Sequence, residues 1–168
     1  MTQEKNTAEN EVLYKEWKPI SLFVTISISL LIVLLITAII TTSILSPEDK
    51  LFTIILCSVL TVFFLLIGIN FRGISITITK EDIVVNFGFL NKKKIPIVDL
   101  ISCEETEATF KKYFGFGVRI GTDSSLGFTT GFGAAVQLKY KDNRPFVFSS
   151  KKPQEICQLL ESLEKMEK

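Results

Sequence analysis

Two long uncharged segments constrain this sequence more than any other feature. Residues 20–45 and 51–71 contain no Asp, Glu, Lys or Arg, and the chain has no His. Buried strands are the alternative, since Ile, Val and Thr favour sheets in water, but strands usually have about 3–10 residues. A bilayer core needs roughly 20 apolar residues of helix, and lipid forces the backbone to satisfy itself. We therefore predict a transmembrane hairpin over residues 19–71, with helices at about 20–45 and 51–71.

The first apolar segment is too long for the core of a cleaved signal peptide, which is about 7–15 residues. It also lacks a small-x-small pair before the turn. We expect this helix to remain as an anchor. No ionisable residue interrupts either span, which weighs against a transporter. The polar residues of the spans could form weak hydrogen bonds between the helices, worth about 0.6 kcal/mol on average; they are Thr25, Ser27, Ser29, Thr37 and Thr41 on the first and Ser58 and Thr61 on the second.

Basic residues flank the hairpin on its outer sides. Lys15 and Lys18 precede it and Arg72 follows it, whereas the connecting "SPEDK" carries Glu48 and Asp49 beside one Lys. Lys and Arg are retained on the cytoplasmic side. We predict a two-span protein of the cell membrane with both termini in the cytoplasm and residues 1–18 as a cytoplasmic tail. Membrane-interface anchors are expected at Tyr14, Trp17, Lys18 and Arg72.

The hydrophobic period changes to two after the hairpin. Ile74, Ile76 and Ile78 alternate with Ser and Thr, "IVVNFGF" returns the chain, and "NKKKIPIVDLISCEE" predicts a third strand with Ile95, Ile97 and, as a further candidate, Leu100 inward. Four short strands follow: "FGVRIG", "SLGFTT", "AAVQLKY" and "RPFVFSS". The last segment has helical spacing of Ile156, Leu159, Leu160 and Leu163. The fold class predicted is membrane-anchored α+β, with a seven-stranded, partly closed antiparallel barrel capped by a C-terminal helix.

Three segments carry a family resemblance: "YFGFGVRIG", "GFTTGFGAAVQL" and "YKDNRPFVFSSKKPQEICQLL". Residues 73–165 resemble the bacterial and archaeal pleckstrin-homology-like (PH-like) domains that follow two transmembrane helices in small membrane proteins, many of which have no assigned function. The resemblance implies that residues 73–168 form a cytoplasmic PH-like domain. We expect this segment to fold on its own.

Six of the nine glycines lie between residues 113 and 133, which suggests a phosphate-binding loop. Gly115, Gly117 and Gly121 follow a G-x-G-x-x-x-G spacing, however, and no amphipathic helix follows. A dinucleotide fingerprint needs G-x-G-x-x-G at the start of a helix, and a Walker loop needs G-K-[ST]. We interpret these glycines as turns and corners of a curved sheet.

Catalytic chemistry has little support in the sequence. The chain has no His, and Cys57, Cys103 and Cys157 are too far apart in sequence for a CxxC pair, so we interpret them as small buried hydrophobes. Glu104, Glu105 and Glu107 could act as acid–base groups or bind Mg²⁺, but a solvated strand edge is the commoner role. We predict a non-enzymatic protein without cofactor or metal.

The remaining candidate surface is basic: Lys92, Lys93, Lys94, Lys111, Lys112 and Arg119. These residues could contact anionic lipid headgroups or an acidic protein, or be solvated turns. The whole chain has 19 basic and 18 acidic residues, which weighs against nucleic acid as a partner. We predict a binding or assembly module with a protein partner or self-association. The alternative is a lipid-headgroup-sensing regulator that uses the basic loops.

Overall fold

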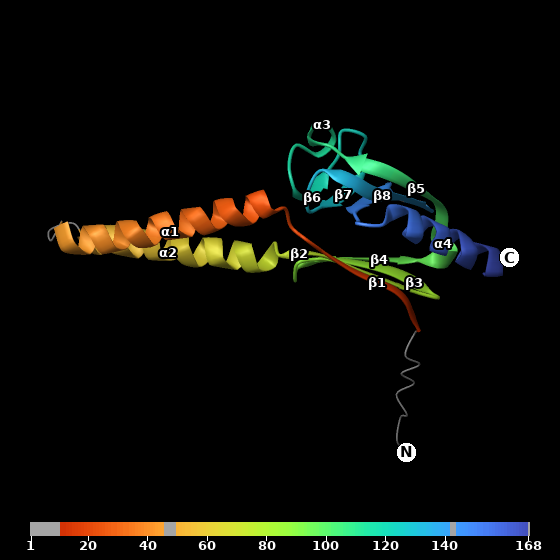
Figure 1. Ribbon diagram of the computed structural model, residues 1–168, viewed down its shortest axis with the longest axis horizontal. Helices are drawn as coiled ribbons and strands as arrows, with labels where there is room; N and C mark the ends of the chain where they lie inside the picture. Colours follow the sequence, from red (N-terminus) through yellow and green to blue (C-terminus); the bar gives the residue numbers. More distant parts are fainter. Residues whose placement is uncertain (1–10, 46–49, 142–143, 168) are drawn as a thin grey trace, which may run out of the picture.

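Two antiparallel helices project from one end of a β domain (Figure 1). The structure is a computed structural model, and it describes residues 11–45, 50–141 and 144–167. Helix α1 spans Leu22–Leu45 and helix α2 spans Lys50–Asn70, so α1 begins two residues later than predicted. Both helices are long and apolar enough to cross a membrane. Most of the connecting segment, with Glu48 and Asp49, lies outside the described residues.

The polar side chains of the helices for which hydrogen bonds are described bond within their own helix, and not across the pair. The hydroxyls of Ser27, Thr37 and Thr61 donate to the carbonyls of Phe23, Val33 and Cys57, at 2.8–2.9 Å. A Ser or Thr hydroxyl can reach the carbonyl one turn back in its own helix, which is the nearest acceptor. The described hydroxyl contacts therefore satisfy the individual helices and do not join them.

The first sheet contains a strand that sequence reasoning missed. Its order is β1-β2-β3-β4, all antiparallel, with β1 at Val12–Pro19, β2 at Gly73–Thr79, β3 at Asp82–Phe87 and β4 at Asn91–Pro96. Strand β1 occupies most of the described part of the predicted N-terminal tail. Pro19 pairs with Gly73, so the helical hairpin is inserted between two neighbouring, paired strands.

The predicted third strand breaks into two strands of different sheets. Pro96 has no N–H to donate, and Ile97 donates instead to the carbonyl of Glu81 at 2.8 Å. A short 3-10 turn, η1 (Ile97–Asp99), then leads into β5 (Leu100–Ala108), the edge of the second sheet. The break explains why one predicted strand became two.

The second sheet has the order β5-β8-β9-β7-β6. Its other strands are β6 at Gly117–Ile120, β7 at Leu126–Thr129, β8 at Gly133–Tyr140 and β9 at Phe146–Ser149. Strand β7 runs parallel to β9. The described residues thus form nine strands in two sheets, one of them mixed, and not a single closed seven-stranded antiparallel barrel.

The core lies between the two sheets and under helix α4 (Pro153–Glu167). The alternating residues Ile74, Ile76 and Ile78 are fully buried, as the period of two predicted. Ile156 and Leu160 of α4 are also fully buried, which confirms the predicted apolar stripe.

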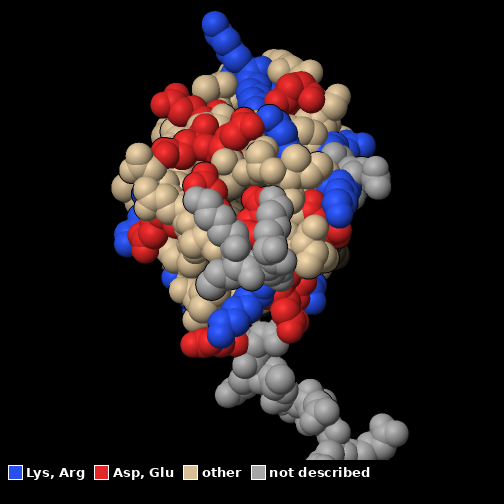
Figure 2. Space-filling view, turned by 90° about the vertical axis from the view of Figure 1, so that its right-hand side faces the viewer, with Lys and Arg blue, Asp and Glu red and all other residues tan. Residues whose placement is uncertain are grey.

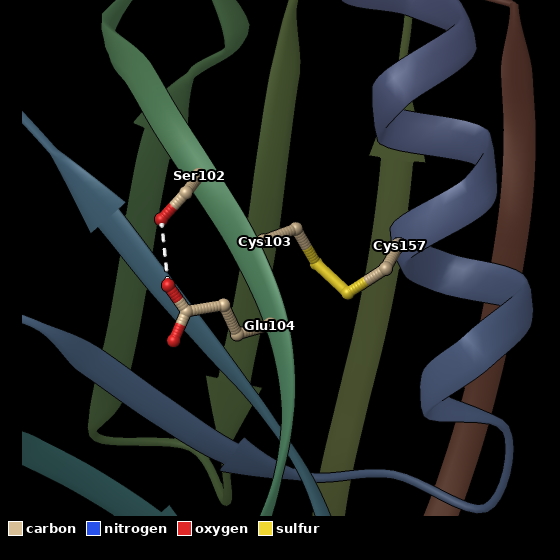
Figure 3. Close-up of a disulfide and its surroundings, with 4 residues drawn as sticks. All are labelled: Ser102, Cys103, Glu104 and Cys157. Carbon is tan, nitrogen blue, oxygen red and sulfur yellow. Dashed lines mark hydrogen bonds between the residues drawn. A yellow bond between two sulfur atoms is a disulfide. The ribbon is translucent and has the colours of Figure 1, made fainter.

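Cys103 and Cys157 form a disulfide that joins β5 to α4 (Figure 3), so their interpretation as isolated hydrophobes was wrong. The two cysteines are 54 residues apart, and only the fold brings their Cα atoms to 5.3 Å. A bond closing a loop of this length stabilises a fold by roughly 4 kcal/mol in the chain-entropy account. Cys57 is free and buried in α2, as predicted.

A buried carboxylate fastens β1 to the second sheet. Glu16 accepts hydrogen bonds from the Tyr14 hydroxyl at 2.8 Å, the Ser150 hydroxyl at 2.6 Å and the Lys151 N–H at 2.6 Å. A charge removed from water needs several such donors. Ser150 follows β9 directly, so this contact holds the first strand of the chain against its C-terminal part.

Candidate functional site

The predicted basic residues fall into two groups on the structure. Lys92, Lys93 and Lys94 lie on β4 itself and not in a loop. Lys94 pairs with Asp82 at 2.7 Å, and the Lys93 ammonium lies 5.3 Å from the centre of the Tyr140 ring. Lys92 is exposed, two residues beyond the β3–β4 turn. Asp82 and Tyr140 thus engage Lys94 and Lys93, whereas Lys92 is exposed for contact with an anionic surface.

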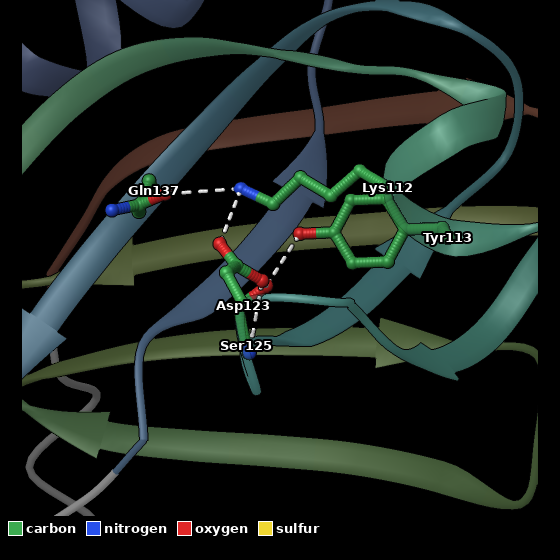
Figure 4. Close-up of polar contacts among 5 residues, drawn as sticks. All are labelled: Lys112, Tyr113, Asp123, Ser125 and Gln137. Carbon is green, nitrogen blue, oxygen red and sulfur yellow. Dashed lines mark hydrogen bonds and ion pairs between the residues drawn. The ribbon is translucent and has the colours of Figure 1, made fainter.

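Lys112 belongs to a polar network rather than to an open basic patch (Figure 4). Its ammonium lies 2.8 Å from Asp123 and donates to Gln137 at 3.4 Å. Asp123 also accepts from the Ser125 hydroxyl at 2.6 Å, and Ser125 shares a 2.8 Å hydrogen bond with Tyr113. The network ties the short helix α3 (Phe110–Tyr113) to the turn before β7.

Electrostatics holds this network in its charged form. Burial opposes ionisation of Asp123, but hydrogen bonds from Lys112 and Ser125 outweigh it and lower the pKa of Asp123 to about 2. Burial also opposes the charge of Lys112, yet the bond to Asp123 raises its pKa overall. Burial raises the pKa of Tyr113. The network holds α3 in place and leaves little of the Lys112 charge for a partner.

The glycine-rich stretch forms turns and short strands, and one glycine in it has a defined packing role. A Cβ on Gly127 would lie 2.5 Å from the ring of Tyr113. The missing side chain of Gly127, a residue of β7, therefore leaves the space that the buried ring of Tyr113 occupies. The segment after Gly117 is strand β6 and not the helix that a phosphate-binding loop requires.

Lys111 and Arg119 are exposed and lie near an aromatic cluster formed by Phe110, Phe114, Phe116 and Phe132. Arg119 donates from Nε to the Phe116 carbonyl at 3.4 Å. With Lys92, they are the predicted basic residues whose charge remains exposed to solvent. Sequence reasoning missed the aromatic cluster, although the concentration of Phe among turn-forming glycines was a usable signal.

The four predicted interface anchors lie where the helices meet the β domain or along β1. Trp17 and Arg72 line a cavity of about 340 Å³ together with Ile69, Gly88 and Phe89. Tyr14 bonds to Glu16. Lys18 donates to the carbonyls of Ser150 at 2.9 Å and Ala134 at 3.2 Å, and burial lowers its pKa. Lys18 thus contacts the domain. Membrane anchoring by all four residues stays a prediction.

The acidic cluster on β5 does not converge on one point. Glu104 pairs with Lys139 at 2.6 Å, which lowers the pKa of Glu104, and accepts from Ser102 (Figure 3). Glu105 and Glu107 line a separate shallow cavity of about 300 Å³ with Ala134 and Pro153. Within residues 11–45, 50–141 and 144–167, no group of three or more His, Cys, Asp or Glu side chains could hold a metal ion.

The end of the domain away from the helices carries mixed charge. Figure 2 shows basic and acidic side chains interspersed over this end. Another cavity, of about 380 Å³, lies between α1 and α2 where the helices meet the domain, and its mainly apolar lining includes Arg72. Among the described residues, neither the mixed-charge end of the domain nor the cavity between α1 and α2 brings reactive side chains together.

Comparison of the chain with protein-family models and with curated protein sequences gave no match. What is established is a β domain of two sheets and a helix joined to two helices that are long and apolar enough to span a membrane. The resemblance to PH-like proteins stays a prediction.

Proposed function

We propose that this chain is a membrane-anchored binding or assembly module without enzymatic activity, built on a PH-like domain. The observation that carries the proposal is the double connection between the helices and the first sheet. Residues 20–21 link β1 to α1, and residues 71–72 link α2 to β2. Ile20 donates to the carbonyl of Arg72 at 3.1 Å across these two links. Such a junction holds the domain at a fixed distance from the bilayer, which suits the presentation of a binding surface.

The partner we propose is a protein, either another component of the membrane or a second copy of this chain. Val98 and Ile101 are exposed, at 63% and 60%, on and just after η1. A photo-crosslinking residue at either position in native membranes should capture one defined protein. The captured protein should then bind the purified full-length chain, and substitution of Val98 and Ile101 by Ser should weaken that binding. Binding that is unchanged by both substitutions would argue against this surface.

The alternative function, sensing of lipid headgroups, is favoured by the exposure of Lys92, Lys111 and Arg119. It predicts that Trp17 emission of the reconstituted chain depends on the fraction of anionic lipid, and that salt weakens the effect. Replacement of the three residues by Gln should abolish it. A response that survives the replacement would exclude this mechanism.

We propose that the domain and both termini face the cytoplasm, because Lys15, Lys18 and Arg72 flank the spans. The Cys103–Cys157 bond favours the opposite side, since disulfides persist in oxidising compartments. We give the basic flanks more weight. In this orientation the reducing cytoplasm would keep Cys103 and Cys157 as two neighbouring thiols, without the disulfide described above. In a cysteine-free chain, an impermeant reagent added outside should label a Cys at Ser46 and spare one at Lys168; the reverse would overturn this orientation.

A further inference from the structure

The end of the β domain that faces the helices exposes large apolar side chains. Phe89 and Leu90, at the tip of the β3–β4 turn, are 77% and 82% exposed. Phe110, Phe114 and Phe132 are 58%, 64% and 49% exposed. We refer to these five residues as the apolar rim. Patches of this kind on soluble surfaces mark contacts with proteins or membranes.

The first part of the apolar rim lies where α2 ends. The N–H of Phe89 donates to the side-chain carbonyl of Asn70, the last residue of α2, at 3.1 Å. Gly88 has a φ of 64°, and a Cβ there would lie 1.8 Å from the Asn70 carbonyl oxygen. Only glycine permits this approach, so the turn that carries Phe89 and Leu90 is held against the helix end.

The second part lies where α1 begins. The N–H of Ser21 donates to the carbonyl of Thr130 at 2.7 Å, one residue before α1. Phe132 lies two residues after Thr130 in the sequence. The ring centres of Phe132 and Phe110 are 5.9 Å apart, and those of Phe110 and Phe114 are 6.2 Å apart. The hydrogen bond from Ser21 to Thr130 joins the segment that carries Phe132 to the start of α1. In Figure 1, α3 lies on the side of the domain from which the helices project.

These positions coincide with the headgroup level of a bilayer. Helix α1 has 24 residues, or about 36 Å, against a hydrocarbon core of about 30 Å. Each link between helix and strand is two residues long. The domain therefore has no spacer that could hold the rim away from the membrane in which α1 and α2 sit.

We propose that the apolar rim inserts into the interfacial layer of the same bilayer that the helices span. The bilayer is the occupant because the rim is continuous with the membrane-spanning surface of the helices. Exposed Lys111 and Arg119 lie beside the rings, which is the arrangement of aromatic and basic groups found at membrane interfaces. This insertion fixes the tilt of the domain and leaves its far end, with Val98, as the end available to a partner. It does not depend on what that partner is.

The chain contains a single tryptophan, which allows a direct test in full-length protein. In a Trp17→Phe background, Phe89→Trp, Phe114→Trp and Phe132→Trp place one probe on the rim, each exchanging one aromatic ring for another. Val98→Trp is the matched control, because Val98 is 63% exposed at the opposite end, beside the β2–β3 turn. Each chain is reconstituted into vesicles of plain phosphatidylcholine or of its acyl-brominated form.

The rim probes should lose emission in brominated vesicles, while Val98→Trp should emit equally in both. Rim probes that emit as strongly as the control would overturn the proposal. A rim that is shielded from bromine but blue-shifted, with a shift that disappears as the protein is diluted in lipid, would also overturn it and would indicate a second copy of the chain as the occupant. Insertion can fail in this test while the protein partner at the far end is still captured, so the two proposals fail separately.

Discussion

Several charged side chains in this protein stabilise the fold through contacts that the residue type alone does not predict. Lys112 was a candidate for contact with an anionic surface, but Asp123 and Gln137 hold its ammonium. Glu16 looks like one charge among several near the N-terminus, yet it is buried with three donors around it. Gln137 lies 25 residues from Lys112, and Ser150 lies 134 residues from Glu16, so no local sequence pattern contains these pairs.

The Asp123 network predicts a specific dependence on pH. The pKa of Asp123 is about 2 in the fold, below its ordinary value of 3.8, so the folded state favours the charged form. Its contribution is complete above about pH 4 and is lost as the pH falls through 2. Asp123→Asn should lower the free energy of unfolding at pH 7 by about 1 kcal/mol, because the side chain is 44% exposed and solvent screens the pair.

The measurement is denaturant unfolding of the full chain in detergent, followed by Trp17 fluorescence from pH 7 to pH 2. The difference between the parent and Asp123→Asn should shrink toward zero at the acid end. Glu105→Gln, an exposed carboxylate on β5, is the control and should change little. A difference that stays constant down to pH 2 would contradict the low pKa.

At the scale of elements, the sequence predicted what local periodicity determines. The alternation of Ile74, Ile76 and Ile78 gave β2, and the spacing of Ile156 and Leu160 gave α4. Strand β1 was missed because Tyr14, Trp17 and Lys18 precede a long apolar segment and were interpreted as membrane-interface anchors. The β4–β5 break and the Cys103–Cys157 pair were missed because they depend on which sheet each strand joins.

Docking of α4 should depend on Leu160, which is fully buried in the core that α4 shares with the two sheets. Leu160→Asp places a carboxylate without a partner in this core and should cost several kcal/mol of unfolding free energy. Gln158→Asp introduces the same residue on the exposed side of α4 and should be nearly neutral. Thermal melts monitored by circular dichroism compare the two; equal melting temperatures would show that α4 is not docked.

For the whole molecule, the decisive feature is that β1 belongs to the domain. Residues 73–168, which we predicted would fold alone, lack β1 and the Glu16 contacts and leave the edge of β2 open. Since Pro19 pairs with Gly73, residues 20–72 can be replaced by an Asn-Gly turn that joins β1 to β2 as an ordinary hairpin.

We expect the Asn-Gly variant to be a soluble protein with one cooperative thermal transition. Residues 73–168 alone should melt at a lower temperature or aggregate. Calorimetry of both proteins at matched concentration makes the comparison. If the shorter chain is equally stable, β1 contributes nothing to the domain.

The insertion of α1 and α2 between β1 and β2 also has a consequence for biogenesis. During synthesis β1 emerges first and waits unpaired until both helices and then β2 have been made. If only one helix crossed the membrane, β1 and β2 would lie on opposite sides of it and could not pair. If α1 and α2 span a membrane, as we propose, the sheet closes only in chains in which both helices have crossed it, so a folded domain implies correct insertion.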